Sequence, residues 1–200
     1  MSITDTAQVP WRTEGLFSKH YLTERLQQPG AAFWPSARDS DRAYDEIRRV
    51  FSENIVGLRK GHEEDCEKRF ITPVIKALGF GHNQRKSIPS IDQQLWPDYI
   101  LYESPSIADA AFHEGTRNAY YAECVALLEA KRWGHNLSEE ASGNGKARKG
   151  RSPHYQIRDY LSEAPSLNWA ILTNGAKWRL YCRQDRASSF FEFDLEAALK

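Results

Sequence analysis

The spacing between apolar residues changes along this chain, from a helical repeat in some segments to short strand-like runs in others. After Asp39 or Ser40, either of which is a suitable N-cap, a helical spacing of apolar residues continues until Gly61. Its members are Tyr44, Ile47, Val50, Phe51, Ile55 and Leu58. We therefore expect one long amphipathic helix here. A second helical pattern runs from His62 to Leu78, and Pro73, which lacks a backbone N–H, predicts a kink or a restart at Thr72.

Shorter apolar runs predict strands downstream. Two of these strands contain Asp98 and Glu129, and three more cover residues 168–173, 177–182 and 190–193. Asn174-Gly175, between two of them, is a strong hairpin signal. Residues 79–95 are turn-rich with one edge strand, and 103–120 hold a short helix after Ser106. A helix over 154–161 and a final helical turn from Asp194 complete the pattern. This order predicts an α/β (α+β) fold with one mixed sheet flanked by helices.

The first forty residues read as irregular, yet they are too rich in aromatic side chains for a disordered tail. We expect them to pack on the rest of the protein. With the first helix they form an N-terminal extension over residues 1–60, and residues 61–200 form the core domain.

Composition limits the possible partners and compartments. The 200 residues contain 27 Lys plus Arg and 27 Asp plus Glu, so any contact with nucleic acid must use local basic patches rather than a general positive field. Three scattered cysteines without metal-ligand spacing are typical of reduced thiols. The chain shows neither a membrane span nor a signal peptide. A soluble cytoplasmic protein is expected.

Two short segments carry the candidate chemistry. They are Trp96-Pro97-Asp98-Tyr99-Ile100 and Leu127-Leu128-Glu129-Ala130-Lys131. On a strand, Glu129 and Lys131 project to one face, and a neighbouring strand could bring Asp98 beside Glu129. Two carboxylates with a nearby lysine suit a hard divalent cation and a cation that orients a nucleophile. The six histidines lack the paired spacing of zinc ligands.

Glu63 adds a further acid. It falls on the apolar stripe of the second helix, where burying a carboxylate calls for a partner or a metal. Glu63 could instead be an acid at a helix start, favoured by the helix dipole. Glu67 falls on the same apolar stripe and competes for the same role.

Together these residues resemble the PD-(D/E)XK nucleases, and more specifically the N-terminal endonuclease region of type IIG restriction-modification enzymes and related type I-like restriction subunits. The matching stretches are Gly15 to Leu22, Glu63 to Pro73, Leu78 to Phe80, Pro97 to Tyr99, Glu129 to Gly134, Gln156 to Leu161, Leu172 to Gly175 and Trp178 to Tyr181. The resemblance implies a restriction-endonuclease-like core: a mixed four-stranded sheet flanked by helices, with a glutamate on the helix before the sheet. Spacing to Phe-Ile-Thr-Pro favours Glu63 over Glu67 as that glutamate.

The resemblance also implies roles for individual residues. Mg²⁺, with Mn²⁺ as a possible substitute, would be held by Asp98, Glu129 and the Ala130 carbonyl, and Lys131 would help to position or deprotonate the attacking water. Glu63 would complete a second metal ion or orient a metal-bound water. Gln156 and Tyr160 match a Gln-x-x-x-Tyr pair beside the active site, so Gln156 would support Lys131 or touch DNA, and Tyr160 would contact DNA. Without the resemblance, a solvated glutamine and a core tyrosine are the better interpretation. A basic run of Lys146, Arg148, Lys149 and Arg151 would meet the DNA backbone, or is simply a solvated loop.

We therefore expect a Mg²⁺-dependent endonuclease that hydrolyses double-stranded DNA, the cleavage domain of a restriction-modification enzyme in phage defence. No phosphate-binding Gly-x-x-x-x-Gly-Lys-Ser/Thr loop and no amino-methyltransferase tetrad are present. The chain is therefore expected to be a nuclease domain of a larger protein, with methyltransferase and target-recognition regions downstream, or a stand-alone relative. Dimerisation would allow both strands to be cut. The alternatives are a catalytically silent DNA-binding or assembly module and a repair or recombination nuclease of the same fold.

Overall fold

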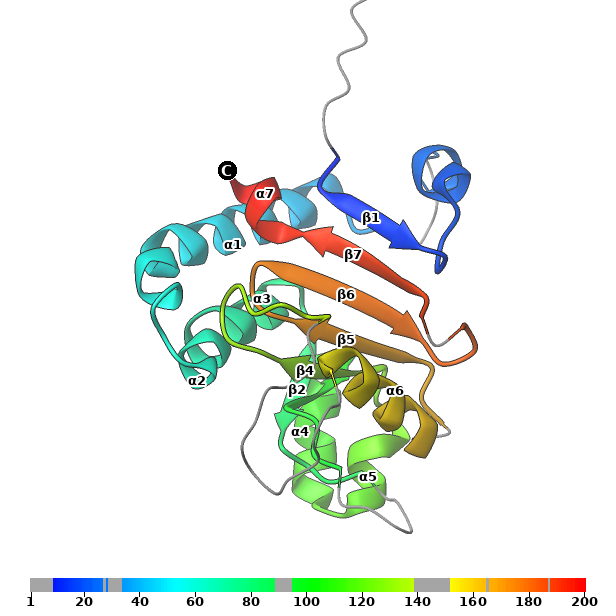
Figure 1. Cartoon of the computed structure of the whole chain (residues 1–200). Helices are drawn as coiled ribbons and strands as arrows, with labels where there is room; N and C mark the ends of the chain where they lie inside the picture. Colours follow the sequence, from blue (N-terminus) through cyan, green and yellow to red (C-terminus); the bar gives the residue numbers. More distant parts are fainter. Residues whose placement is uncertain are drawn as a thin grey trace, which may run out of the picture.

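The computed structural model describes residues 9–26, 28, 34–88, 95–138, 152–164, 166–186 and 188–200. Within this part of the chain, a seven-stranded sheet runs in the order β1-β7-β6-β5-β4-β3-β2, with helices against both faces (Figure 1). The strands are β1 (Trp11–Glu14), β2 (Gly81–Gln84), β3 (Tyr99–Tyr102), β4 (Ala126–Ala130), β5 (Trp169–Thr173), β6 (Lys177–Cys182) and β7 (Phe190–Asp194). The helices are α1 (Ala37–Leu58), α2 (Glu63–Cys66), α3 (Thr72–Ala77), α4 (Pro105–Glu114), α5 (Arg117–Ala122), α6 (Pro153–Glu163) and α7 (Leu195–Leu199), with π-helical turns η1 (Tyr21–Arg25) and η2 (Glu67–Ile71). The predicted mixed α/β class is confirmed.

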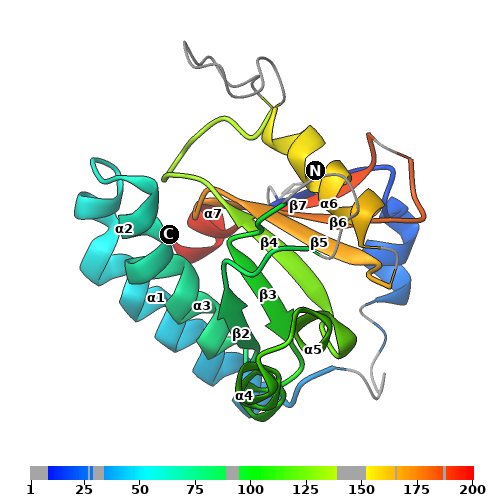
Figure 2. The ribbon, with the colours of Figure 1, turned by 90° about the horizontal axis from the view of Figure 1, so that it is seen from below.

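Helix α1 is the long amphipathic helix that the apolar spacing predicted. It begins earlier than expected, because the side chain of Ser36 accepts a hydrogen bond from the backbone N–H of Asp39 and caps the helix. Most of its apolar stripe packs against η2 and α3, in a core that also contains Phe70 and Ile71, whereas Tyr44 at the start of the stripe is 44% exposed. Figure 2 shows α1, α2 and α3 together on one side of the sheet.

The second predicted helix is continuous from α2 through η2 to α3, and its winding changes along its length. The helix does not restart at Thr72, but its winding changes there: α3 begins at this residue, with Pro73 in its first turn. The preceding turn, η2, is π-helical, so each turn holds more residues than in an α-helix. Glu67 is 3% exposed, in agreement with its place on the predicted apolar stripe, whereas Leu78, expected on the same stripe, is 52% exposed at the end of α3.

The central strands explain the mixed character of the sheet. Strands β2, β3 and β4 form an antiparallel meander, with β2 at the sheet edge as predicted, whereas β5 pairs parallel to β4. Parallel neighbours need a crossover connection, and α6 lies between β4 and β5 in the chain. Helix α6 packs on β5, in a core that contains Leu127, Leu172 and Tyr160. One end of α6 is therefore held above the carboxyl end of β4.

The hairpin predicted at Asn174-Gly175 joins β5 to β6. The backbone N–H of Asn174 donates to the Lys177 carbonyl at 3.2 Å, and Gly175 has a φ of +79°. A Cβ at Gly175 would lie 2.5 Å from the ring of Trp133. The turn therefore requires glycine both for its conformation and for its packing.

The N-terminal segment contains more regular structure than expected. Residues 11–14 form β1, which pairs antiparallel with β7 at the other sheet edge. The prediction of an irregular segment was wrong here, because the alternation in Trp-Arg-Thr-Glu is too short to identify a strand without its partner. The excursion 103–120 likewise holds α4 and most of α5 rather than one short helix. Among the described helices, none has the length and apolar character needed to cross a bilayer.

Candidate active site

Asp98 and Glu129 lie close together at the ends of two neighbouring interior strands, just before β3 begins and near the end of β4. The antiparallel register pairs Tyr99 with Leu128, so one further step places Asp98 opposite Glu129 on the same face. The carboxylate Oδ2 of Asp98 accepts a hydrogen bond of 2.8 Å from the backbone N–H of Ala130. The two acids thus lie on adjacent strands, and the backbone itself orients one of them.

Lys131 lies on the same face as Glu129, as the alternation of the strand predicted. Its backbone N–H donates to the Thr173 carbonyl at 2.7 Å, which keeps the chain extended beyond the last residue of β4. Its ammonium Nζ lies 2.5 Å from Glu129 Oε1, and both side chains are largely shielded from solvent. A buried carboxylate and a buried ammonium are therefore paired beside Asp98.

Helix α6 provides the second contact to Glu129. The hydroxyl Oη of Tyr160 lies 3.0 Å from Glu129 Oε2 and 3.1 Å from the Trp96 carbonyl, and it accepts a hydrogen bond of 2.7 Å from Gln156 Nε2. Tyr160 is 2% exposed. The expected DNA contact therefore does not match its position, because the hydroxyl is turned inward to hold Glu129. Gln156 contacts Tyr160 and not the expected partner Lys131.

A cluster of three carboxylates extends the site toward α2 and η2. Ligand oxygens of Glu63, Glu67 and Asp98 all lie within 4.8 Å of one another. Glu63 is partly exposed, whereas Glu67 is buried. The structure therefore brings both glutamates to Asp98 rather than selecting Glu63, which the spacing had favoured.

Arg85 is a site residue that sequence analysis did not identify. It follows β2, and its Nη2 lies 3.1 and 3.2 Å from the two carboxylate oxygens of Glu67. A lone arginine after a turn-rich edge strand gives no sequence signal for this contact. Only the pairing of β2 with β3, which brings the Arg85 backbone N–H to the Asp98 carbonyl, reveals it.

Burial and charge shift the pKa values of the site in a consistent pattern. Burial raises the pKa of Glu129 to about 7, against the opposing effect of the nearby Lys131 ammonium. Burial likewise raises the pKa values of Asp98, Glu63 and Glu67 above their ordinary ranges. For Lys131, burial favours the neutral amine, but the surrounding carboxylates outweigh it and raise its pKa. The four acids thus share a site that disfavours their combined negative charge.

The remaining predicted site residues fall in two groups. Lys146, Arg148, Lys149 and Arg151 lie outside the described residues. Ala130, whose carbonyl the resemblance implies as a metal ligand, has a fully buried side chain on the opposite face and donates its N–H to Asp98.

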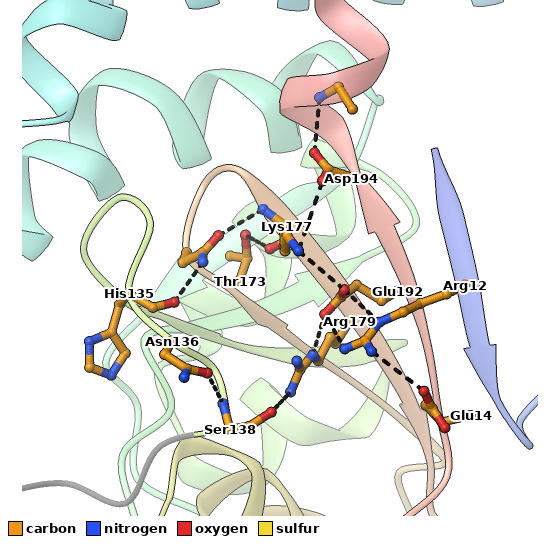
Figure 3. Close-up of polar contacts among 12 residues, drawn as sticks. Arg12, Glu14, His135, Asn136, Ser138, Thr173, Lys177, Arg179, Glu192 and Asp194 are labelled. Atoms are coloured by element: carbon orange, nitrogen blue, oxygen red, sulfur yellow. Dashed lines mark hydrogen bonds and ion pairs between the residues drawn. The ribbon is translucent and has the colours of Figure 1, made fainter. Parts of the chain in front are cut away.

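A second cluster of charged residues lies on the same face of the sheet as Glu129, on strands further along. Glu129 is opposite Leu172, Leu172 opposite Arg179, and Arg179 opposite Glu192. Glu192 is buried and lies 2.5 Å from Arg179 Nε and 2.8 Å from Arg12 Nε (Figure 3). These ion pairs connect β1, β7 and β6 on the face that carries the candidate site.

Arg179 of this cluster and the nearby Asn174 also contact the segment that follows β4, residues 131–138. Arg179 Nη1 donates to Ser138 Oγ at 3.1 Å, and Asn174 Nδ2 donates to the His135 carbonyl at 2.7 Å (Figure 3). Residues shortly after Lys131 are therefore attached to the β5–β6 hairpin, which limits movement of the site from this side.

Comparisons with protein-family models, with curated proteins and with solved structures find no match to this chain.

Proposed function

We propose that this chain is a Mg²⁺-dependent DNA endonuclease with a PD-(D/E)XK, restriction-endonuclease-like core, the cleavage domain of a restriction-modification enzyme. One observation carries the proposal: Asp98, which precedes β3, lies close to Glu129 and Lys131 at the end of the neighbouring strand β4, where Lys131 Nζ is 2.5 Å from Glu129 Oε1. Burial of these charges is costly for the fold, which favours a catalytic over a purely structural role.

The arrangement of the elements supports the same proposal. Strands β2 to β5 form a mixed four-stranded unit with helices on both faces, and the helix that precedes β2 carries Glu63 and Glu67. This is the architecture that the resemblance implies. Strands β1, β6 and β7 extend the sheet beyond it.

The donor set fits a magnesium ion. Carboxylate oxygens are the ligands that Mg²⁺ prefers, and two oxygens bound to one Mg²⁺ lie at most about 4.2 Å apart. Ligand oxygens of Glu63 and Asp98 already lie within 4.8 Å of each other, so small side-chain adjustments would bring both to one ion. Asp98 and Glu129 would hold the ion, with the Ala130 carbonyl and Glu63 completing the protein ligands. When bound, Mg²⁺ would polarise the scissile phosphate and lower the pKa of a coordinated water.

The protein's own side chains have separable roles in this reaction. Lys131 keeps its proton because the carboxylates raise its pKa, so its ammonium can stabilise negative charge that develops on the phosphate. Tyr160 orients Glu129 through its hydroxyl, and Gln156 orients that hydroxyl in turn. Lys131 would also help to place the attacking water.

A plasmid-cleavage assay with and without Mg²⁺ tests the proposal. We expect the wild type to nick or cut the plasmid only with metal, and Asp98→Asn, Glu129→Gln and Lys131→Met each to be slower by roughly 100-fold or more. Glu53→Gln is a matched control, because Glu53 is an exposed glutamate in an ion pair on α1. Thermal melts would verify that every variant folds.

Two results would contradict the proposal. Cleavage by Asp98→Asn at the wild-type rate would show that the site is misassigned. A folded wild type that binds DNA and Mn²⁺ but cuts no duplex, branched or single-stranded DNA would favour the silent DNA-binding module.

A further inference from the structure

Arg85 has an unusual backbone conformation at the edge of the candidate site. Among the described residues, Arg85 is the only non-glycine with a positive φ, at +51°. Side chains with a Cβ rarely adopt this region, and it persists only where the surroundings enforce it. Here the backbone N–H of Arg85 donates to the Asp98 carbonyl at 3.2 Å. The fold therefore imposes the direction in which the Arg85 side chain leaves the sheet.

The guanidinium of Arg85 is held by a buried carboxylate. Its Nη2 contacts both carboxylate oxygens of Glu67, at 3.1 and 3.2 Å. Glu67 is buried, whereas the Arg85 side chain is 59% exposed. Nε and Nη1 make no hydrogen bond within the described part of the chain. A buried acid thus holds the group, while Nε and Nη1 are without a partner among the described residues.

The charges around Arg85 indicate what that ligand is. Arg85 follows β2 and Lys131 follows β4, so the two cations lie on either side of Asp98. Lys86, the next residue, is not a third cation beside Asp98, because its ammonium packs over the ring of Tyr120, 4.7 Å from the ring centre. A planar guanidinium matches the oxygens of a phosphate better than an ammonium does. A polyanion that approaches the acidic cluster needs such a cation beside it.

On the basis of the proposed nuclease function, we propose that Arg85 binds a DNA phosphate next to the scissile one and that Glu67 positions its guanidinium. In this assignment Glu67 binds the Arg85 guanidinium, and the carboxylate ligands of the metal ion are Asp98, Glu129 and Glu63. The contact adds affinity without reading base sequence, because it is made to the backbone.

Binding of a fluorescent DNA duplex in saturating Ca²⁺, measured by anisotropy over a range of salt, tests this inference. We expect Arg85→Gly, which accepts the positive φ, to bind DNA about tenfold more weakly. Its slope of log affinity against log salt should fall by about 0.9, the value of one lost phosphate contact. Arg85→Lys should keep most of the slope but lose part of the affinity. Arg49→Ala is the control, since it removes a comparably exposed, ion-paired arginine from α1.

Titration with Mn²⁺ alone separates this role from a structural one. Removing the Arg85 cation from the acidic cluster should tighten Mn²⁺ binding while DNA binding weakens. Loss of both would assign Arg85 a structural role and overturn the inference. Unchanged DNA affinity and salt slope in both Arg85 variants, with a wild type that cuts DNA, would overturn the inference and leave the nuclease function standing. A wild type that neither binds nor cuts DNA would overturn both.

Discussion

The substitution Tyr160→Phe removes one oxygen atom from the centre of the candidate site. That oxygen accepts a hydrogen bond from Gln156 and lies within hydrogen-bond distance of Glu129 Oε2 and of the Trp96 carbonyl. A hydroxyl carries a single hydrogen, and an ionised carboxylate is the stronger acceptor. The substitution therefore leaves an oxygen of Glu129 without its donor, with little change in the volume of the core.

The expected magnitude follows from these contacts. A hydrogen bond to a charged group contributes about 1.5–3 kcal/mol, so we expect the free energy of unfolding of the metal-free protein to fall by about 2 kcal/mol. For a domain of this size, that corresponds to a decrease of about 4–8 °C in Tm. The lost bond also raises the pKa of Glu129 further above its value of about 7. Mn²⁺ binding at about pH 7 should therefore weaken by roughly three- to tenfold.

Thermal denaturation without metal and calorimetric titration with Mn²⁺ measure the two effects. Tyr155→Phe is the matched control, because Tyr155 lies on the same helix with its side chain exposed and should change stability by less than about 0.5 kcal/mol. If Tyr160→Phe had the Tm and the Mn²⁺ affinity of the wild type, the hydroxyl would not hold Glu129, and the reasoning would be refuted.

Three further predictions concern packing, protonation and the second charged cluster. Gly175→Ala should lower the free energy of unfolding by about 2–5 kcal/mol, because a Cβ there would lie 2.5 Å from the indole ring of Trp133. Gly134 also has a positive φ but lies in open space, so Gly134→Ala should lower it by only about 1–2 kcal/mol. Urea titration measures the free energy of unfolding of both variants, and equal losses would show that the Trp133 ring does not crowd a Cβ at position 175. Glu129 must be ionised to bind metal, so the association constant of Mn²⁺ should rise about tenfold per pH unit below about pH 7 and level off above it, and a flat profile would exclude the shift. Glu192→Gln should destabilise the protein by about 3–5 kcal/mol, because Arg179 is left buried without its charge partner, and a change below about 1 kcal/mol in urea titration would contradict this.

The elements that sequence predicted well are those whose apolar pattern is long or has strong boundary signals. The stripe of α1 and the Asn174-Gly175 turn between β5 and β6 belong to this group. The pairing of Lys131 with Glu129 was also predictable, because it depends only on the two-residue period of a strand. Local rules are sufficient for these features.

The features that sequence missed depend on contacts between distant segments. Strand β1 forms only because β7 offers an edge to it. The convergence of Glu63 and Glu67 on Asp98 depends on how their helix packs against the sheet, which their place on one apolar stripe does not reveal. The place of Arg85 follows from its backbone contact with Asp98 across two strands. None of these leaves a local pattern in the chain.

The most direct measurement is a crystal structure of the protein soaked in Mn²⁺, with the ion located by its anomalous scattering. We expect one peak within about 2.5 Å of carboxylate oxygens of both Asp98 and Glu129, with the Lys131 ammonium moved away from Glu129 Oε1. A Mn²⁺ ion bound only by Glu63 and Glu67, or no ion at the site at all, would contradict the account.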